Sequence, residues 1–270
     1  MQKNWLIKTS HPKLQVEISN ALKIHPIVAQ LLINRGMTTA KEAEDFLAAD
    51  LSRLHDPFLL KDMDAAVGRI QKAKDKKETV LIFGDYDVDG ITSSAILKNT
   101  LTALGIPAIN YIPHRLNEGY GLNHGIVAFA KEKKVKLLVS VDCGIGAMAE
   151  IEALRENGID TIVLDHHEPH EGRLPNAVAI VNPKQKDCVY PFDGLASVGL
   201  SFKLSQALTG ERAQEYLDLV AMGTIADVAE LNGENRVFVK EGLKRIMTTK
   251  NVGLKALMEV ARIKSRKIRP

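Results

Sequence analysis

Residues 79–94, TVLIFGDYDVDGITSS, constrain the fold of this chain more than any other stretch. The first five residues are apolar or β-branched and predict a buried strand. Three aspartates, Asp85, Asp87 and Asp89, follow at every second position, and Gly90 then precedes the start of a helix. Three carboxylates within five residues repel one another, so a fold keeps them together only with compensation. A divalent cation held by oxygen ligands is the simplest compensation, and the stretch therefore predicts half of a metal site.

The same aspartates match the opening of a helix–loop–helix calcium site, D-x-D-x-D-G. That loop requires a bidentate glutamate at its twelfth position, which is Ile96 here, and a helix where this chain has an apolar strand. The calcium loop is therefore excluded. A solvated acidic turn remains the alternative for this stretch taken alone.

Length and composition narrow the class of protein. The 270 residues suit one large domain or two small ones, and 45% hydrophobic with 26% charged residues is typical of a globular protein. A net charge of +3 gives no global attraction to nucleic acid, so any phosphate-binding surface must be local. No apolar run approaches the roughly 20 residues of a membrane span. With no signal-peptide core at the start, Cys143 and Cys188 indicate free thiols in the cytoplasm.

The pattern along the chain changes near residue 76. Helical periodicity predicts a small helical N-terminal segment over 1–75. Apolar stretches then alternate with amphipathic ones, which predicts an α/β domain over 76–232, with a parallel five-stranded sheet and helices on both faces, before a helical connector over 233–270. The predicted strands are 80–83, 108–112, 137–141, 161–164 and 178–181, and the predicted helices are 91–104, 124–134, 146–157, 195–208, 211–223 and 234–248.

Acidic and histidine residues follow three of these strands. Beside the Asp85 cluster, Asp142 closes the third strand in LLVSVDCGIG. The fourth strand ends in Asp165, His166 and His167, within TIVLDHHEPH. Because ligand sites in open α/β sheets form outside the carboxyl ends of the strands, we expect these motifs to converge on one rim.

A fourth motif, GTIADVAEL, places Asp227 between two short predicted helices, within reach of the same rim. Carboxylates outnumber imidazoles among these residues and no cysteine pair competes, which favours Mn²⁺ or Mg²⁺ over structural zinc. So many ligands predict two ions sharing a bridging carboxylate, and a phosphoester is the natural substrate of such a pair.

The four motifs GDYDVDG, SVDCG, DHH and GTIADVAEL together resemble those of the DHH phosphoesterase family, and within it the RecJ-type single-strand-specific 5′→3′ exonucleases. Three further stretches, IPHRLNEGYGLN, VNPKQKDCVYPF and LASVGLSFKL, share the resemblance, which extends over essentially the whole chain. It implies a metal-dependent enzyme that hydrolyses single-stranded DNA to 5′-mononucleotides in repair and recombination. It also implies a monomer that works beside a helicase and a single-strand-binding protein, away from membranes.

The resemblance also assigns roles to individual residues. Five residues are expected to ligate the metal pair, with Asp142 as the central bridge: Asp87, Asp89, Asp142, His166 and Asp227. In the catalytic group, Asp85 is an accessory ligand, His167 meets the scissile phosphate and Asp165 orients the imidazoles.

One loop supplies the expected substrate contacts. Within HRLNEGYG, Arg115 is expected to clamp a phosphate and Tyr120 to stack on a base, with Glu118 grouped beside them as a substrate-binding residue. A surface ion pair between Arg115 and Glu118 is the structural alternative.

The chain departs from the family in two respects. Some members carry a histidine where this chain has Phe83, so one metal ligand must come from Asp85 or water. RecJ-type proteins also continue into a DHH-associated domain and an oligonucleotide-binding barrel beyond the part matched here. The resemblance therefore implies that this chain is the catalytic part of such an enzyme or a shortened relative of it.

Three other interpretations remain open. The same metal chemistry would serve hydrolysis of short oligonucleotides or cyclic dinucleotides, and a non-catalytic DHH scaffold would retain only the fold. A dinucleotide-binding oxidoreductase rests on Gly144-x-Gly146-x-x-Ala149, a loose version of that fingerprint. It is the weakest interpretation, because Asp142 stands where a pyrophosphate would approach.

Overall fold

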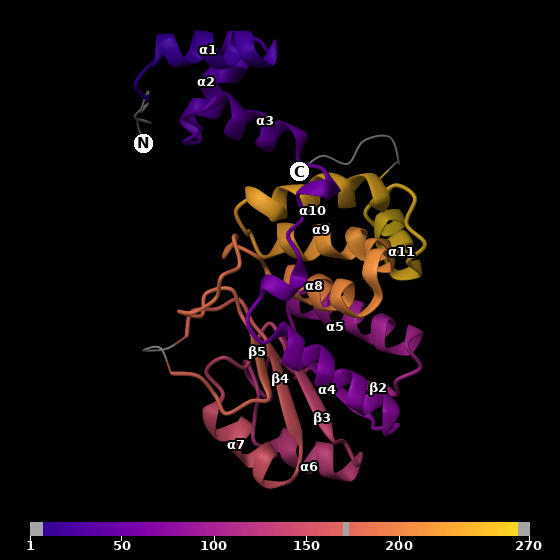
Figure 1. Cartoon of the computed structure of the whole chain (residues 1–270). Coiled ribbons are helices and arrows are strands. Elements are labelled where there is room, and N and C mark those ends of the chain that lie inside the picture. The colour runs from indigo at the N-terminus through magenta and orange to yellow at the C-terminus, as the bar shows by residue number, and fades with distance from the viewer. Residues whose placement is uncertain (1–7, 170–172, 264–270) are drawn as a thin grey trace, which may run out of the picture. The chain divides into compact units, whose positions relative to one another are not determined.

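A computed structural model describes residues 8–169 and 173–263, and helices and one parallel sheet make up its regular structure (Figure 1). The chain divides into two compact units, with the boundary between Ala49 and Asp50. The domain limits predicted near residues 75 and 232 stay predictions. Within the described ranges, no helix is both long and apolar enough to cross a bilayer.

The first unit is built from three short helices, α1 (Pro12–Leu22), α2 (Pro26–Asn34) and α3 (Ala40–Ala48). Proline opens both α1 and α2, where its fixed φ and missing N–H suit the first turn. Thr39 and Glu42 form a reciprocal capping box at the start of α3. The apolar faces of the three helices pack around Ile18, Ala29, Leu32 and Ala43.

The second unit contains the predicted sheet. Its strands are all parallel and lie in the order β2-β1-β3-β4-β5. Each predicted strand is confirmed to within one residue at either end, because each is an apolar run bounded by turn residues. The strands are β1 (Val80–Gly84), β2 (Ala108–Tyr111), β3 (Leu137–Val141), β4 (Asp160–Leu164) and β5 (Ala179–Val181).

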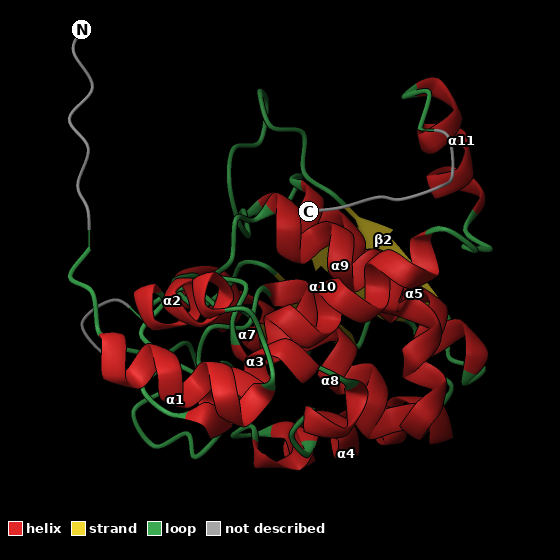
Figure 2. Ribbon diagram, turned by 90° about the horizontal axis from the view of Figure 1, so that it is seen from above, coloured by secondary structure: helices red, strands yellow, loops and turns green. Residues whose placement is uncertain are grey.

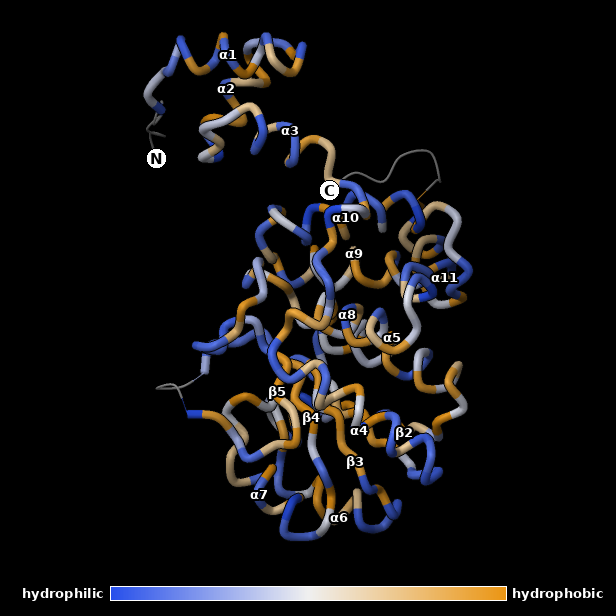
Figure 3. Tube along the Cα trace, in the orientation of Figure 1, coloured by the Kyte–Doolittle hydropathy of each residue, from blue (hydrophilic) through white to orange (hydrophobic). Residues whose placement is uncertain are grey.

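Alternate residues of the strands feed two separate cores, so helices cover both faces of the sheet, as predicted. On one face, Ile82 and Val139 pack into the core that contains α4 (Met63–Asp75) and α5 (Val88–Ala103). On the other, Leu81 and Leu138 pack beneath α6 (Gly125–Glu132) and α7 (Met148–Glu156). Figure 3 shows the hydrophobic colour concentrated along the strands between these two layers.

Beyond the sheet the chain is helical. The helices are α8 (Ser197–Thr209), α9 (Leu217–Ala226), α10 (Gly233–Ile246) and α11 (Val252–Val260). Contacts join α5 to α8 and α9, and α9 to α10 (Figure 2). The single helix predicted over 211–223 is wrong in detail, because Gly210–Tyr216 forms a 3₁₀ helix before α9 begins. Shorter 3₁₀ turns, Leu51–Arg53 and Pro57–Leu59, precede α4.

A buried ion pair joins helices α8 and α10. Lys203 on α8 and Glu234 on α10 are 0% and 1% exposed, and Nζ lies 2.7 Å from Oε1. The Lys203 ammonium also donates to the carbonyl of His55, and the Tyr190 hydroxyl donates to the second Glu234 oxygen. Because every charged atom of the pair has a partner, the pair can remain ionised in the interior.

Candidate metal centre

The register of the sheet places the predicted aspartates side by side. The backbone N–H of Asp85 donates to Val141 O at 3.3 Å, and that of Asp142 donates to Leu164 O at 3.0 Å. Asp165 donates in the same way to Val181 O at 3.4 Å. Each aspartate therefore sits one residue beyond its strand and is bonded to the end of the next, which confirms that these three aspartates line one edge.

The side chains at this edge form three overlapping groups of possible metal ligands. The groups are Asp85, Asp87 and Asp142; Asp142, His166 and His167; and Asp89, His166 and Asp227, each with its ligand atoms within 4.8 Å of one another. Asp142 and His166 each belong to two groups, which suits a pair of ions. All five residues predicted as ligands are brought together.

Buried atoms without partners test whether a cation fits. Oδ1 of Asp85, Oδ1 of Asp142 and Nε2 of His166 are buried and have no hydrogen-bond partner, and the last two lie 3.5 Å apart. Buried polar atoms are nearly always paired, and leaving one unpaired is costly. Mixed carboxylate and imidazole donors are ligands of Mn²⁺ and related divalent ions. The residues present therefore fit a divalent metal.

The acidity of the cluster points the same way. Burial, with the charge of Asp142, raises the pKa of Asp89 to about 8, and burial, with the charge of Asp87, raises that of Asp142 to about 8. Burial also raises the pKa of Asp85 and of Asp227. The protein alone thus favours the protonated form of these carboxyl groups, and a bound cation would favour the ionised form.

Helix α5 begins earlier than predicted, at Val88 instead of residue 91, because Asp87 caps it. The Asp87 carboxylate accepts from Gly90 N at 3.0 Å, which puts Asp89 inside the first turn. A Cβ at Gly90 would lie 2.4 Å from Asp85 O, so only glycine lets the helix approach the turn this closely. The predicted helix start at residue 91 is therefore three residues too late.

Asp89 is held from the other side of the unit. Its two carboxylate oxygens accept from Ser197 N at 2.8 Å and from Val198 N at 2.7 Å, at the start of α8. A helix N-terminus favours an anion, because its first N–H groups lack partners within the helix. This contact fixes Asp89 across 108 residues of sequence.

The residues of the DHH motif have different tasks. Asp165 is buried and accepts from Ile145 N at 2.9 Å, from His167 N at 3.1 Å and from the His167 ring at 2.7 Å. Burial alone would raise the pKa of Asp165, but these hydrogen bonds outweigh it and hold the pKa below its usual value. The Asp165 carboxylate in turn raises the pKa of His167 to about 9. The arrangement suits Asp165 to the predicted orienting role.

The loop after β2 is anchored over this edge. The Tyr120 hydroxyl donates to Asp142 O at 3.2 Å, and its ring centroid lies 6.2 Å from that of His167. Glu118 accepts from His114 N at 2.7 Å and from the Tyr111 hydroxyl, which lowers its pKa. Glu118 thus shapes the loop in this structure, and its contact with substrate stays a prediction.

Arg115 packs on an aromatic ring and does not form the surface ion pair with Glu118 that was the structural alternative. Its guanidinium carbon lies 5.1 Å from the centroid of the Tyr86 ring. Phe83 is fully buried in β1 and stacks on Tyr111 with ring centroids 5.5 Å apart. Because Phe83 turns away into the core, the unpaired oxygen of Asp85 is the group nearest in sequence that can replace a histidine ligand.

Three supporting groups escaped sequence reasoning. Tyr86 lies between two aspartates and drew no attention beside them. The N–H groups of Ser197 and Val198 lie in LASVGLSFKL. This stretch resembles the family, but the resemblance assigned no function to its residues. Asn182, fully buried, donates to His167 O at 2.9 Å and steadies the DHH turn. The one sequence signal for Asn182 was its position, because it is a polar residue that directly follows the fifth strand.

The dinucleotide alternative gains no support. Gly144 has a φ of +113°, and a Cβ there would lie 2.6 Å from Ser140 Oγ, so this glycine serves a tight turn. The following N–H, of Ile145, is already bonded to Asp165 and is not free for a pyrophosphate.

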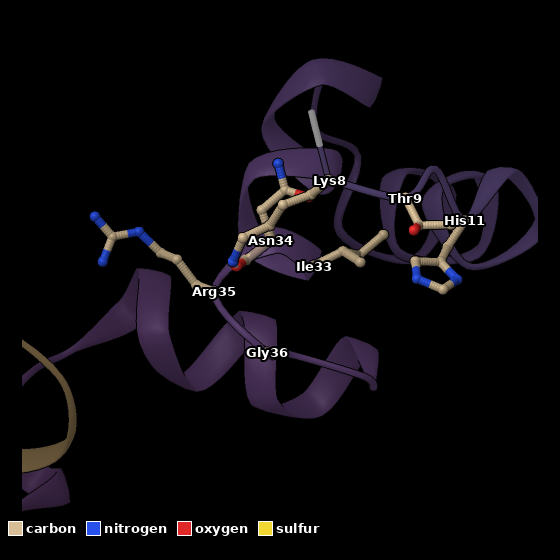
Figure 4. A pocket seen from close by; sticks show the side chains of 7 residues that line it. All are labelled: Lys8, Thr9, His11, Ile33, Asn34, Arg35 and Gly36. Atoms are coloured by element: carbon tan, nitrogen blue, oxygen red, sulfur yellow. The ribbon is translucent and has the colours of Figure 1, made fainter. Parts of the chain in front are cut away.

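A separate hollow of about 700 Å³ lies in the first unit (Figure 4). It is lined by Lys8, Thr9, His11, Ile33, Asn34, Arg35 and Gly36. None of these is among the predicted site residues, and the lining contains no carboxylate. It therefore lacks the ligands of a metal centre.

Comparison with known proteins identifies relatives that are similar over most of this chain. The chain is 43% identical over 257 residues to the single-stranded-DNA-specific exonuclease RecJ of Bacillus subtilis, covering 95% of this chain and 33% of that protein. A crystal structure of exonuclease RecJ bound to manganese is 40% identical, with a TM-score of 0.69 over 77% of this chain and 54% of that one. RecJ from Thermus thermophilus in complex with Mn²⁺ is 32% identical, with a TM-score of 0.78 over 96% of this chain and 37% of that one.

The chain therefore spans about a third of the Bacillus relative and little over half of the first of these structures. The family model described as "DHH family, N-terminal domain" matches residues 79–224, more than half of the chain. This match covers the sheet, the aspartate turn and the DHH turn described above. The chain belongs to the DHH family.

Proposed function

We propose that this chain is the catalytic part of a metal-dependent exonuclease that hydrolyses single-stranded DNA from its 5′ end to 5′-mononucleotides. The observation that carries the proposal is the set of three overlapping ligand groups with buried, unpaired atoms at the carboxyl edge of the sheet. Such a set serves phosphoester hydrolysis with two divalent ions. Relatives named as single-stranded-DNA-specific exonucleases support the choice of substrate.

The five predicted ligands divide the metal-binding work. Asp142 and His166 are shared between groups, and Asp87, Asp89 and Asp227 complete them, with Asp85 as a further oxygen donor. When bound, divalent metal supplies charge neutralisation and activation of the attacking water. Mn²⁺ or Mg²⁺ is the proposed cofactor, since RecJ structures similar to this one are described with each ion.

The remaining residues bind and orient the phosphate. His167, with a pKa of about 9, carries a proton at neutral pH and is half-exposed, so it can donate to an oxygen of the scissile phosphate. Asp165 keeps the imidazole in place through the bond to Nδ1. Tyr120, 57% exposed, offers a face on which a base can stack, and Arg115 offers donors to a second phosphate.

Strand selectivity would follow from stacking and backbone contacts, which every base can satisfy. The proposed partners are single-stranded DNA and, as the resemblance to RecJ-type enzymes implies, a helicase that exposes it and a single-strand-binding protein that covers it. We propose that the chain acts as a monomer, as the resemblance to RecJ-type enzymes implies.

The test is degradation of a 3′-labelled oligonucleotide of about 20 nucleotides in Mn²⁺, with EDTA as the metal-free control. Asp142→Asn removes the shared carboxylate, and Asp75→Asn makes the same change at an exposed position on α4 as the matched control. We expect progressive loss of 5′ nucleotides by the unmodified chain and by Asp75→Asn, and none by Asp142→Asn or in EDTA.

Other results would select the alternatives. Cleavage confined to two- to four-residue substrates or cyclic dinucleotides would replace the exonuclease with a phosphodiesterase of small substrates. Failure to bind Mn²⁺ by calorimetry would indicate a non-catalytic scaffold. Activity unchanged in Asp142→Asn would refute the proposed site itself.

A further inference from the structure

Tyr86 occupies a special place at the metal edge. It separates Asp85 from Asp87 in the turn after β1 and is half-buried, whereas Asp85 is buried and Asp87 is exposed. Its ring carries the guanidinium of Arg115 at 5.1 Å from the centroid. The aromatic ring thus brings a residue of the β2 loop onto the turn that contributes two of the ligands.

The loop that carries Arg115 is itself anchored on either side. Glu118 bonds to His114 N and to the Tyr111 hydroxyl, and Tyr120 bonds to the carbonyl of Asp142. The backbone near Arg115 is therefore fixed, and the remaining freedom lies in its long side chain. A partner for that side chain decides where the positive charge rests.

An aromatic partner differs from a carboxylate in what it leaves available. A carboxylate takes up guanidinium donors and cancels the charge, so it competes with a phosphate for the same group. A ring contacts the flat face of the guanidinium and leaves the N–H donors at its edge free. At an edge crowded with aspartates, a ring holds Arg115 without consuming it.

We propose that Tyr86 is a positioning residue for substrate, whose ring holds the Arg115 guanidinium beside the metal edge with its donors free for a phosphate of the single strand. The inference rests on the proposed function, because it takes single-stranded DNA as the ligand. The inference gives a role to Tyr86, which the sequence motif marks only as the residue between Asp85 and Asp87.

The test compares Tyr86→Phe, which keeps the ring, with Tyr86→Leu, which removes it, in the full chain and in an Arg115→Met background. Lys133→Met serves as the matched control, because Lys133 also lies over a ring, that of Phe129, on α6. Binding is measured by fluorescence anisotropy of a phosphorothioate oligothymidylate in Mn²⁺, and cleavage is measured separately on an unmodified strand. Mn²⁺ affinity is followed by calorimetry.

We expect Tyr86→Leu to raise Kd for the strand, and KM for cleavage, by roughly 2- to 30-fold, the range that a cation–aromatic contact supports. Tyr86→Phe and Lys133→Met should stay within about twofold of the unmodified chain, which the retained ring and the distant location of the control predict. Tyr86→Leu should add nothing in the Arg115→Met background, and kcat and Mn²⁺ affinity should not change.

Three results would overturn the inference: an equal loss in Tyr86→Phe, an undiminished effect of Tyr86→Leu without Arg115, or no binding of the strand by the unmodified chain. Its failure is distinct from failure of the proposed function. If the strand is bound with the expected pattern but is not cleaved, the positioning role holds and the exonuclease proposal fails. If the strand is cleaved without that pattern, only the role of Tyr86 is refuted.

Discussion

Replacing Asp142 by asparagine should stabilise the metal-free protein while abolishing its response to metal. Asp142 has a φ of +62°, in the left-handed region that asparagine and aspartate both tolerate. The side chains have nearly the same shape, so Asp142→Asn removes a charge with little change in backbone geometry. The effect on stability therefore reports the electrostatics of the site.

The magnitude follows from the pKa of this carboxyl group. In the folded chain it is raised from 3.8 to about 8, chiefly by burial. At pH 7 the folded, metal-free chain therefore keeps a proton that the unfolded chain has lost, at a cost of up to about 4 kcal/mol. Asp89 shares part of this repulsion, so we expect Asp142→Asn to gain about 2–4 kcal/mol in the free energy of unfolding.

The same shift fixes the dependence on pH. Between about pH 4 and pH 8 the folded metal-free chain binds more protons than the unfolded chain, because the folded pKa is the higher one. The stability of the unmodified chain in EDTA should therefore fall as the pH rises through this window, and that of Asp142→Asn should fall less. Bound Mn²⁺ favours the ionised carboxylates, so it should reverse the trend.

Urea unfolding in EDTA at pH 5 and pH 7.5, repeated with increasing Mn²⁺, measures both effects. The unmodified chain should gain stability with the logarithm of Mn²⁺ concentration once the site is saturated, about 2.7 kcal/mol at a hundredfold excess over Kd. Asp142→Asn should gain little. A variant that is less stable than the unmodified chain in EDTA and equally stabilised by Mn²⁺ would refute the reasoning.

Three further predictions concern the supports of the site. Gly90→Ala places a Cβ 2.4 Å from Asp85 O, so we expect a loss of about 1–3 kcal/mol in urea unfolding and at least tenfold slower cleavage; an unaffected enzyme would show that α5 can move freely. Lys203→Met leaves Glu234 buried without its cation and should cost about 3–5 kcal/mol, partly recovered by adding Glu234→Gln, and no recovery would contradict a paired charge. His167→Gln should lower kcat at least about 100-fold while Mn²⁺ affinity in calorimetry falls far less than in Asp142→Asn, and the reverse order would make His167 a principal ligand.

Much of the fold follows from local pattern. The five strands are short apolar runs bounded by turn residues. Because all of them run in the same direction, their carboxyl ends lie at one edge of the sheet. Those two steps bring Asp85, Asp142 and Asp165 together before any side chain is seen. Assignment of nuclease chemistry required the family resemblance, since spacing alone predicts only a metal and a phosphoester.

Side-chain partners at the site could not be predicted, because several were equally reachable in sequence. Glu118 could pair with Arg115 three residues away, but it bonds to Tyr111 and the backbone of His114. Asp87 could belong to a loop, but its carboxylate meets the N–H of Gly90 and starts the helix early. Such choices depend on competition between donors that only the folded backbone brings into range.

Hydrogen bonding sorts the carboxylates of this edge into those the protein satisfies and those it leaves for a cation. Asp165 accepts three hydrogen bonds, and its pKa is held below the usual value, so it needs no metal to remain ionised. Asp89 accepts two backbone N–H groups, yet burial among other carboxylates still raises its pKa to about 8. Asp85 and Asp142 each keep a buried oxygen with no hydrogen-bond partner, and that of Asp142 lies 3.5 Å from Nε2 of His166. Metal binding should thus change the protonation of Asp165, the aspartate of the DHH motif, least. The affinity for metal must arise at the oxygens of Asp85 and Asp142 that have no hydrogen-bond partner.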